Sequence, residues 1–292
     1  MSLPFPEHPL RLLVSQELHL RTFESVRAPV CVAHFAYQCG ERGSGANVAH
    51  LMRLLEAFGV KAPPAAEVGQ YLHMDLGGLR LRWERHTEFT TYGFTLPLSP
   101  ECTAAHPFAE QPLALLPKDW LAELPGQVVA AALLVLESAQ MPERTPAELT
   151  ALFDGNPVIG AEVAGGAGLA WSDLRIHADG FGRILLRDRG LTDAQAGRLV
   201  KRVLDVNTYR AMTLLGLPAA RDVAGALSEA ERRLADVAAR MGRNGEARID
   251  AGVGVPVSEQ ALLAELTDVA AEIESVAART TSRFDATAAY YQ

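Results

Sequence analysis

The sequence predicts a mixed α/β (α+β) fold: a mixed, largely antiparallel sheet covered by helices, followed by long antiparallel helices. Three observations predict it. Short alternating or apolar runs broken by Gly and Pro fill residues 1–190, long helical periodicities fill residues 191–292, and two of those periodicities repeat every seven residues. We therefore divide the chain into an α/β sheet domain, 1–190, and a helical, coiled-coil-like hairpin domain, 191–292.

Strands and helices interleave in the first part. Runs rich in β-branched and aromatic residues predict strands over 29–37, 70–76, 78–84, 88–96, 127–137, 158–164, 168–177 and 182–188. Amphipathic periodicity predicts helices over 9–20 and 47–60, and Pro and Thr begin shorter ones over 117–126 and 145–153. This alternation is typical of a sheet with helices packed on it.

Helical signals dominate the second part. Thr192 and Gln195 form a capping box before a helix that should run to about residue 215 and stop at Gly216. Two heptad seams then predict an antiparallel pair of long helices: Val223, Leu227, Ala230, Leu234, Val237 and Met241 on the first, and Leu262, Leu266, Val269, Ile273, Val276 and Thr280 on the second. The polar, Gly-rich stretch 242–257 is expected to be a loop. The last helix carries no stop signal, so we expect the natural chain to continue.

The composition is that of a globular protein that is soluble as given. Hydrophobic residues make up 49% and charged residues 21%, and the formal net charge of −8 argues against a protein that binds nucleic acid. The longest apolar run, 128–136, is far shorter than the roughly 18 residues that cross a bilayer, and the start has no signal-peptide pattern. Three cysteines, an odd number in a long chain, indicate a reducing cytoplasm.

The usual signatures of phosphate-binding loops, dinucleotide sites, serine hydrolases and zinc peptidases are missing. Cys31, His34, Cys39 and His50 have a zinc-like C-x2-H-x4-C-x10-H spacing. Cys31, however, lies in a predicted half-buried strand, whereas zinc ligands usually cluster on turns. Free thiols are therefore the simpler interpretation.

Residues 83–89, WERHTEF, form a first polar cluster. Apolar and charged residues alternate from 79 to 84, which places Trp83 and Glu84 on opposite faces of a strand, and the alternation then fails. An acid, a base and an anion clamp could come from Glu84, Arg85, His86 and Glu88. The same residues fit the polar end of a strand with internal ion pairs, which imitate active sites. We favour the structural interpretation.

The predicted hairpin 168–190 holds a second polar cluster. An odd-length loop that pairs Ile176 with Ile184 keeps apolar side chains on one face and sets Asp173 opposite Arg187. The other face would carry Trp171, Asp173, Arg175, His177, Arg183 and Arg187, with Asp179 in the turn. Opposite charges across strands contribute roughly 0.2–1 kcal/mol each. The surplus of arginine could bind an anion or the acidic face of a partner.

Several longer phrases resemble an uncharacterised bacterial family of predicted membrane-anchored proteins, a domain of unknown function. They are HPLRLLVSQELHLRTF, LRWERHTEFTTYGF, PKDWLAELPG, the run from EVAGGAGLAWSDLRIH to LLGLPAAR, and RFDATAAYY. The resemblance covers nearly the whole chain. It implies a C-terminal apolar segment beyond residue 292 that enters the membrane, and a place on the cytoplasmic face of the inner membrane. It implies no catalytic residue, because the family has no established activity.

The layout is similar to that of CorA-type divalent-cation transporters, in which a mixed α/β cytoplasmic domain precedes long helices and membrane segments. This similarity implies that carboxylates could bind a divalent cation, with Asp173, Asp179, Asp205, Glu265 and Asp268 as candidates. No other cofactor is expected. Our leading hypothesis is a cytoplasmic, membrane-anchored, self-associating homo-oligomer, more in keeping with a regulatory or transporter domain than with an enzyme. The alternatives are an enzyme or small-anion site at Glu84–Glu88 and a scaffold that binds a protein through the hairpin 171–189.

Overall fold

The computed structural model describes residues 6–12, 14–15, 23–39, 43–249 and 258–291. The chain packs as two compact units, residues 1–208 and 209–292, and each is described by itself. The boundary falls inside a helix, later than the change in sequence character at residue 190. Of the predicted helix over 9–20, residues 11–12 and 14–15 are helical, and residues 13 and 16–20 lie outside the described residues. The predicted mixed α+β fold is confirmed.

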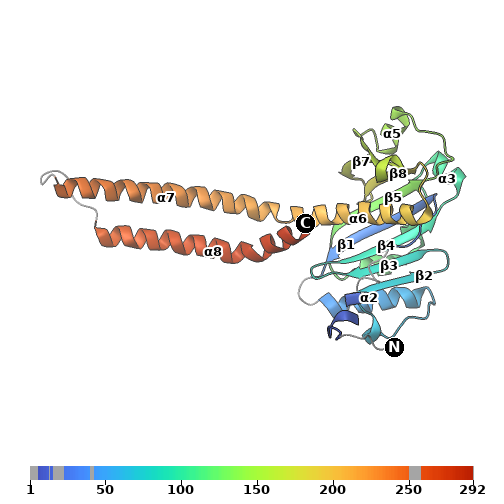
Figure 1. The fold of residues 1–292 in the computed structure, drawn as a ribbon, viewed down its shortest axis with the longest axis horizontal. Coiled ribbons are helices and arrows are strands. Elements are labelled where there is room, and N and C mark those ends of the chain that lie inside the picture. The colour runs from blue at the N-terminus through green and yellow to red at the C-terminus, as the bar shows by residue number, and fades with distance from the viewer. Residues whose placement is uncertain (1–5, 13, 16–22, 40–42, 250–257, 292) are drawn as a thin grey trace. The chain divides into compact units, whose positions relative to one another are not determined.

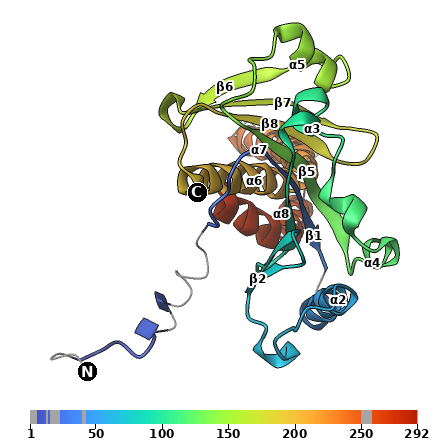
Figure 2. The ribbon, with the colours of Figure 1, turned by 90° about the vertical axis from the view of Figure 1, so that its right-hand side faces the viewer.

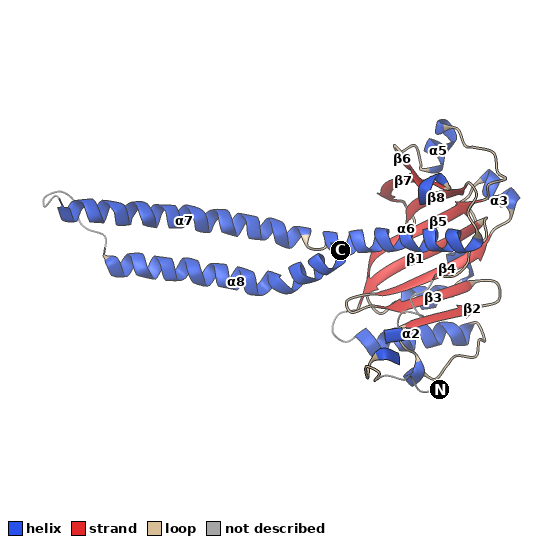
Figure 3. Cartoon of the chain, in the orientation of Figure 1, coloured by secondary structure: helices blue, strands red, loops and turns tan. Residues whose placement is uncertain are grey.

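The first unit is built on one sheet with the strand order β2-β3-β4-β1-β5-β8-β7-β6 (Figure 3). Neighbouring strands are antiparallel, except that β5 and β8 are parallel. Each strand lies close to its predicted range, and Gly or Pro marks several of the ends, such as Pro29 before β1 and Gly126 before β5. The bounds are β1 Val30–Gln38, β2 Tyr71–Asp75, β3 Arg80–Arg85, β4 Thr90–Pro97, β5 Gln127–Glu137, β6 Ile159–Val163, β7 Gly168–Ile176 and β8 Gly182–Asp188.

Helices cover both faces of this sheet (Figures 1 and 2). On one face, Leu51 and Leu54 of α2 (Gly43–Ala57) pack with Trp83 of β3. On the other, Leu199 and Leu204 of α6 pack against β1, β5 and β8. The remaining helices are α3 Pro100–Ala105, which the sequence did not predict, α4 Lys118–Ala122, α5 Pro146–Leu152 and α6 Asp193–Leu214, with single turns η1 Ala65–Glu67, η2 Pro112–Leu115 and η3 Ala164–Gly166.

The predicted capping box at the start of α6 is confirmed. The backbone amide of Thr192 donates to Gln195 Oε1 at 2.9 Å, and the amide of Gln195 donates to Thr192 Oγ1 at 3.3 Å. Thr145 and Glu148 form the same device at α5. These bonds satisfy amides that a helix start leaves without partners, so both helices begin where their sequences indicate.

The predicted register of the β7–β8 hairpin is wrong. Ser172 pairs with Ile184, and Ile176 pairs with Gly182, so neither Ile176–Ile184 nor Asp173–Arg187 is a cross-strand pair. The register shifts between Ser172 and Ile176, where Leu174 has a φ of 57°. Such a bulge adds residues to one strand and turns its side chains. As a result Leu174 and Ile176 are exposed, although the sequence placed them on the apolar face.

The second unit contains the predicted antiparallel pair of long helices, α7 (Leu217–Ile249) and α8 (Glu259–Tyr291). The predicted stop is confirmed, because α6 ends at Leu214 and α7 begins just after Gly216. The predicted loop 242–257 is wrong at its start, because α7 continues to Ile249, and the remaining residues 250–257 lie outside the described residues. A helical glycine costs about 1 kcal/mol relative to alanine and does not by itself end a helix.

The predicted heptad seams are half right. Ala230 and Val237 of α7 are 1% exposed against α8, as predicted. The alternate seam positions, Leu227, Leu234 and Met241, point instead to solvent. Arg233 and Arg240 of α7 face α8 instead, and they form ion pairs with Glu272 and Glu265 across the hairpin. In the described part of the chain, no helix has an apolar stretch long enough to cross a bilayer.

Candidate functional site

The sheet register assembles a polar pocket on the face that carries α6. Gly93 of β4 pairs with Arg82 of β3 on one side and with His34 of β1 on the other. Because side chains alternate along a strand, Glu84 of β3 lies on the same face as Arg82. Lys201 and Asp205 close the pocket from α6, and Glu24 from the segment before β1. We call this the sheet pocket: Glu24, His34, Arg82, Glu84, Gly93, Lys201 and Asp205, around a cavity of about 60 Å³.

Charged side chains of the sheet pocket form pairs with one another or with neighbours. Lys201 Nζ lies 2.6 Å from Asp205 Oδ2, and Arg82 makes a direct ion pair with Glu84. Glu24 Oε1 lies 3.2 Å from His73 Nδ1, and its other oxygen lies 3.9 Å from Arg80. Opposite charges therefore balance around the cavity.

Glu84 is a buried carboxylate that stays ionised. Burial alone would raise its pKa, but the hydrogen bond with His86 and the charges of Arg82 and Lys201 outweigh burial and lower the pKa to about 2. His86 Nε2 lies 3.5 Å from Glu84 Oε2, and the His86 ring stacks on Phe89 with 4.3 Å between centroids. At neutral pH Glu84 therefore acts as an acceptor and a negative charge, with no proton to donate.

His34 has a buried ring nitrogen that its surroundings do not satisfy. Its Nδ1 is buried and meets no hydrogen-bond partner among the residues that the structure describes. Burial lowers the pKa of His34 to about 4, although the charges of Asp205 and Glu84 act in the opposite direction. The imidazole is therefore neutral near pH 7. A buried polar atom without a partner is uncommon in folded proteins.

The structure separates the residues of WERHTEF. The predicted alternation is confirmed, since Trp83 packs in the core on the α2 side while Glu84 lines the sheet pocket. The strand ends at Arg85, and a turn follows in which the His86 amide donates to the Phe89 carbonyl. Arg85 and Glu88 are half-buried and are not among the residues that line the pocket.

Sequence reasoning did not find the sheet pocket as a unit. Glu84 was a candidate for acid–base or anion-binding chemistry, Asp205 for a cation site, and His34 only for a zinc pattern. Glu24 and Lys201 were not considered. The pocket draws on three strands, a helix and a loop, so local periodicity could not bring its members together. The sequence TTYGFT of β4 contains one signal that could have indicated the pocket. Its alternate residues Thr91, Gly93 and Thr95 are small or polar, whereas a strand covered by a helix usually has larger apolar side chains on that face.

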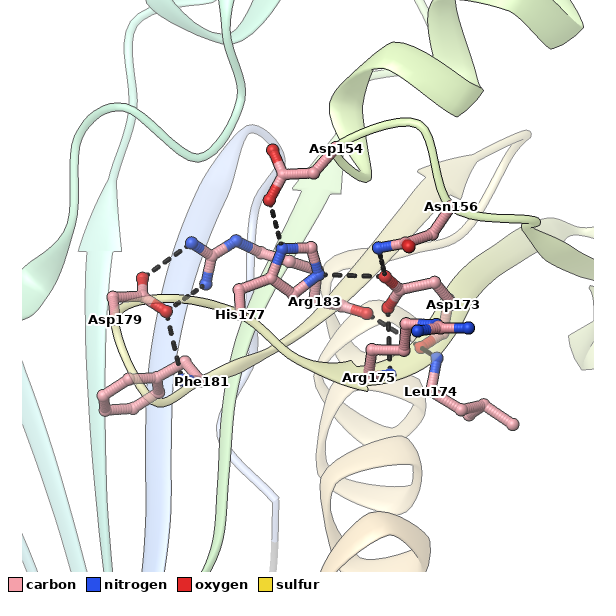
Figure 4. A network of polar contacts seen from close by, with 10 residues as sticks. Asp154, Asn156, Asp173, Leu174, Arg175, His177, Asp179, Phe181 and Arg183 are labelled. Atoms are coloured by element: carbon pink, nitrogen blue, oxygen red, sulfur yellow. Dashed lines mark hydrogen bonds and ion pairs between the residues drawn. The ribbon is translucent and has the colours of Figure 1, made fainter.

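The β7–β8 hairpin holds a second polar cluster (Figure 4). His177 lies between two carboxylates, with Nδ1 2.8 Å from Asp154 Oδ2 and Nε2 3.0 Å from Asp173 Oδ2. Asn156 Nδ2 also donates to Asp173 at 2.9 Å, and the amide of Arg175 donates to its other oxygen. Each imidazole nitrogen therefore lies within about 3 Å of a carboxylate oxygen. This cluster ties the loop after α5 to the hairpin and leaves His177 poorly placed for acid–base work on a ligand.

Most of the other predicted hairpin residues contact neighbours within the molecule. Arg183 forms an ion pair with Asp179 at 2.6 Å and lies over the Phe108 ring. Trp171 lies on Gly160 of β6, since a Cβ there would be 2.7 Å from its ring. Arg175 is exposed. The predicted surplus of binding arginines is therefore largely used in internal contacts.

Arg187 belongs to a separate buried ion cluster. Its guanidinium donates to the carbonyl oxygens of Met141 and Pro142 and lies 3.8 Å from Glu137 Oε2. Arg144 Nε donates to Glu137 Oε1 at 2.7 Å. These contacts fasten the 138–145 loop to the end of β5.

In the described part of the chain, no group of three or more His, Cys, Asp or Glu residues is arranged to hold a metal ion. The zinc-like spacing does not form a site, because Cys31 and His34 face opposite sides of the sheet and His50 stacks on Trp120. Several candidate carboxylates already have partners: Asp173 with His177, Asp179 with Arg183, Asp205 with Lys201 and Glu265 with Arg240.

The profile of a family described as protein of unknown function, DUF3422, matches residues 6–292. The chain is a member of the DUF3422 family. The match spans both units, so the sheet pocket and the α7–α8 hairpin both lie within the region that it covers. No curated protein and no solved structure matches the chain. The sequence resemblance to a family of unknown function is thus confirmed, whereas the membrane anchor and the CorA-like layout stay proposals.

Proposed function

We propose that this DUF3422 chain is the self-associating part of a membrane-anchored protein, and that the α7–α8 hairpin of one copy docks on the hairpin of a second copy. The observation that carries the self-association is the exposed column of Leu227, Leu234 and Met241, which are 49%, 39% and 53% exposed. We call this the outer column of α7. Side chains of this kind repeating every seven residues are typical of a helix that packs against a partner.

The inner seam of the hairpin explains why this column has no partner in one copy. Each helix turns a row of apolar residues towards the other, Ala230 and Val237 from α7 and Leu262 and Val269 from α8. The second row there is ionic, with Arg233 Nη1 2.8 Å from Glu272 Oε2. In a two-stranded coiled coil, both apolar rows are normally buried against one neighbour. Here the bulkier row faces away, which favours a further helix layer on that side.

Helix α8 contributes to the same side of the hairpin. An apolar groove of about 270 Å³ lies between the helices, lined by Leu227 of α7 and by Ile273, Val276 and Phe284 of α8, among others. Ile273 is 41% exposed. Because this groove contacts both Leu227 and Ile273, these two exposed side chains lie on one face of the hairpin. That face can receive an apolar ridge from a second hairpin.

The available area is sufficient for a stable dimer. Each 33-residue helix is about 50 Å long and about 10 Å wide, so one face of the pair offers roughly 1,000 Å². Specific interfaces bury about 800 Å² on each partner. A two-fold contact of the same face on both copies closes on itself and gives a four-helix bundle.

Sedimentation velocity on the purified chain tests this proposal. The wild type should sediment as a dimer of twice 31.4 kDa, and Leu227→Glu with Leu234→Glu should sediment as a monomer with an unchanged far-UV circular dichroism spectrum. Leu263→Glu is the matched control, because Leu263 is 65% exposed and belongs to neither predicted seam. A monomeric wild type, or a double variant that still dimerises, contradicts the proposal. Repeating the sedimentation runs with Mg²⁺ tests the CorA-like layout. If the chain has that layout, the divalent cation should strengthen self-association.

The membrane anchor is supported by the sequence resemblance. Cells that express the product of the complete gene should hold it in the inner-membrane fraction, and external protease should digest the sheet unit only after the cells are lysed. Recovery of the protein in the supernatant after high-speed centrifugation contradicts the membrane anchor. The self-association is tested separately by sedimentation velocity.

A further inference from the structure

A second and larger cavity, of about 620 Å³, borders α6. Its apolar lining comes from α6, from the segment before β1, from the end of β6 and from the loop before α6, and consists of Phe23, Val163, Leu191, Leu199, Val203 and Val206. We call this cavity the α6 groove. Small-molecule sites typically enclose about 300–1,000 Å³ and are mostly apolar, with a few polar groups that orient the ligand. The α6 groove therefore has the size and the lining of a ligand site.

Main-chain contacts hold two walls of the α6 groove together. The Val26 amide donates to the Asp193 carbonyl at 2.9 Å, which ties the segment before β1 to the start of α6. One turn further along, Gly197 leaves no room for a Cβ beside the Glu24 carbonyl. The groove between these segments exists without a ligand, so binding does not have to pay for ordering its walls.

Basic side chains border the α6 groove. Arg198 and Arg202, one helical turn apart on α6, are exposed, and neither has a carboxylate partner in the described part of the chain. The Arg198 guanidinium lies 4.9 Å from the centroid of the Phe23 ring, a cation–π contact that keeps it at the groove. Lys201 and Asp205 neutralise each other. The groove thus carries an excess of positive charge in a chain whose formal net charge is −8.

We propose that the α6 groove binds the anion of a small amphiphile, a carboxylate at the end of an unbranched apolar chain. Arg198 and Arg202 donate to the carboxylate, and such charge-assisted hydrogen bonds are roughly twice as strong as neutral ones. The apolar chain lies along the floor formed by residues such as Val203 and leaves water there. A cationic amphiphile would meet the two arginines as like charges. The proposal rests neither on the self-association nor on the membrane anchor.

Methyl NMR on the wild-type chain tests the proposal. The protein carries ¹³C-methyl valine and is titrated at pH 7 with sodium decanoate, sodium hexanoate and decyltrimethylammonium bromide. Decanoate should shift the Val203 and Val206 signals in a saturable way, with a Kd on the order of millimolar, and leave Val276 of the α7–α8 groove in place. A fully buried methylene tightens binding roughly fourfold, so the shorter hexanoate should bind at least about tenfold more weakly. The cationic amphiphile should not saturate these signals.

Two double variants make the test specific to the arginines. Arg198→Gln with Arg202→Gln should raise the decanoate Kd about tenfold or more. Arg175→Gln with Arg221→Gln is the matched control, because it removes the same charge from exposed positions outside the groove, and its Kd should match that of the wild type. Any of four outcomes overturns the proposal: no saturation by decanoate, equal Kd values for decanoate and hexanoate, equal Kd values for decanoate and the cationic amphiphile, or equal Kd values for the two double variants.

Discussion

His34 and Gly93 are cross-strand neighbours on β1 and β4, and the glycine leaves open the space beside the imidazole. The Cβ that Gly93 lacks would stand 3.7 Å from His34 Cδ2, an ordinary contact distance. The sheet pocket therefore exists because one position in a covered strand carries no side chain. Ala132, which pairs with His34 on its other side, is buried in the apolar core under α6.

Gly93→Ala should stabilise the protein. The new methyl group enters the cavity without a clash, and a glycine in a strand costs roughly 0.5–1 kcal/mol relative to alanine. We expect the free energy of unfolding, measured by urea titration, to rise by about that amount. A loss of more than about 1 kcal/mol would mean that the space beside His34 is filled in solution.

Gly197→Ala should have the opposite effect, although helix propensity alone favours alanine by about 1 kcal/mol. A Cβ at Gly197 in α6 would lie 1.8 Å from the carbonyl oxygen of Glu24. Helix α6 and the segment before β1 would have to move apart, and we expect a loss of roughly 1–3 kcal/mol in the same urea titration. Unchanged stability would show that this close approach does not persist in solution.

The His34 ring should make the folded protein less stable in acid. Its folded pKa is about 4 and its unfolded pKa is the ordinary 6.5, so the unfolded state binds more protons between these values and stability falls as pH drops from 6.5 to 4. This contribution is on the order of 2 kcal/mol. Urea titrations from pH 7 to 4.5 should show it in the wild type and not in His34→Gln. Parallel curves for the two proteins would contradict the assigned pKa.

Glu84 predicts a separate transition at lower pH. Its folded pKa of about 2 lies below the ordinary 4.5, so its stabilising effect is complete above pH 4.5 and is lost as pH falls from 4.5 towards 2. Glu84→Gln should flatten the stability curve in this window and leave the window of His34 nearly unchanged. Loss of the higher-pH slope in Glu84→Gln would instead show that the two groups titrate as one coupled unit.

Glu137→Ala should be strongly destabilising. It removes a fully buried carboxylate from Arg144 and Arg187, both mostly buried, and breaking a buried ion pair typically costs about 3–5 kcal/mol. Glu143→Ala is the control: Glu143 pairs with Arg189 at the surface, its side chain is 73% exposed, and the expected loss is below about 1 kcal/mol. Similar losses in the two variants would contradict a structural role for the buried cluster.

The sequence predicts the strands well because their alternation and their Gly and Pro boundaries are local. It places Trp83 and Glu84 on opposite faces for the same reason. It does not predict the register of β7–β8, because the bulge at Leu174 lies beside tertiary contacts such as that of Asp173 with Asn156. The pairing of His34 with Gly93 lies in strands about sixty residues apart, so no local pattern could reveal it.

The hairpin shows a different limit of sequence reasoning. Heptad spacing correctly selected Ala230 and Val237 as buried residues, but it could not say which second column faces the partner helix. Cross-helix ion pairs of Arg233 and Arg240 rotate α7 so that Leu234 points outward. The apolar column that the sequence assigned to the inside of the hairpin is therefore the column that we propose to lie between two copies.

An isotope-filtered NOE experiment on a mixed dimer tests this central claim most directly. One copy carries ¹³C-labelled Leu, Ile and Met methyl groups in a deuterated background, and the other is unlabelled. We expect intermolecular NOEs to the methyl groups of Leu227, Leu234, Met241 and Ile273. If these methyl groups show no intermolecular NOEs, whether the chain is a dimer or a monomer, the outer column of α7 is not the self-association face. The proposed function is then wrong.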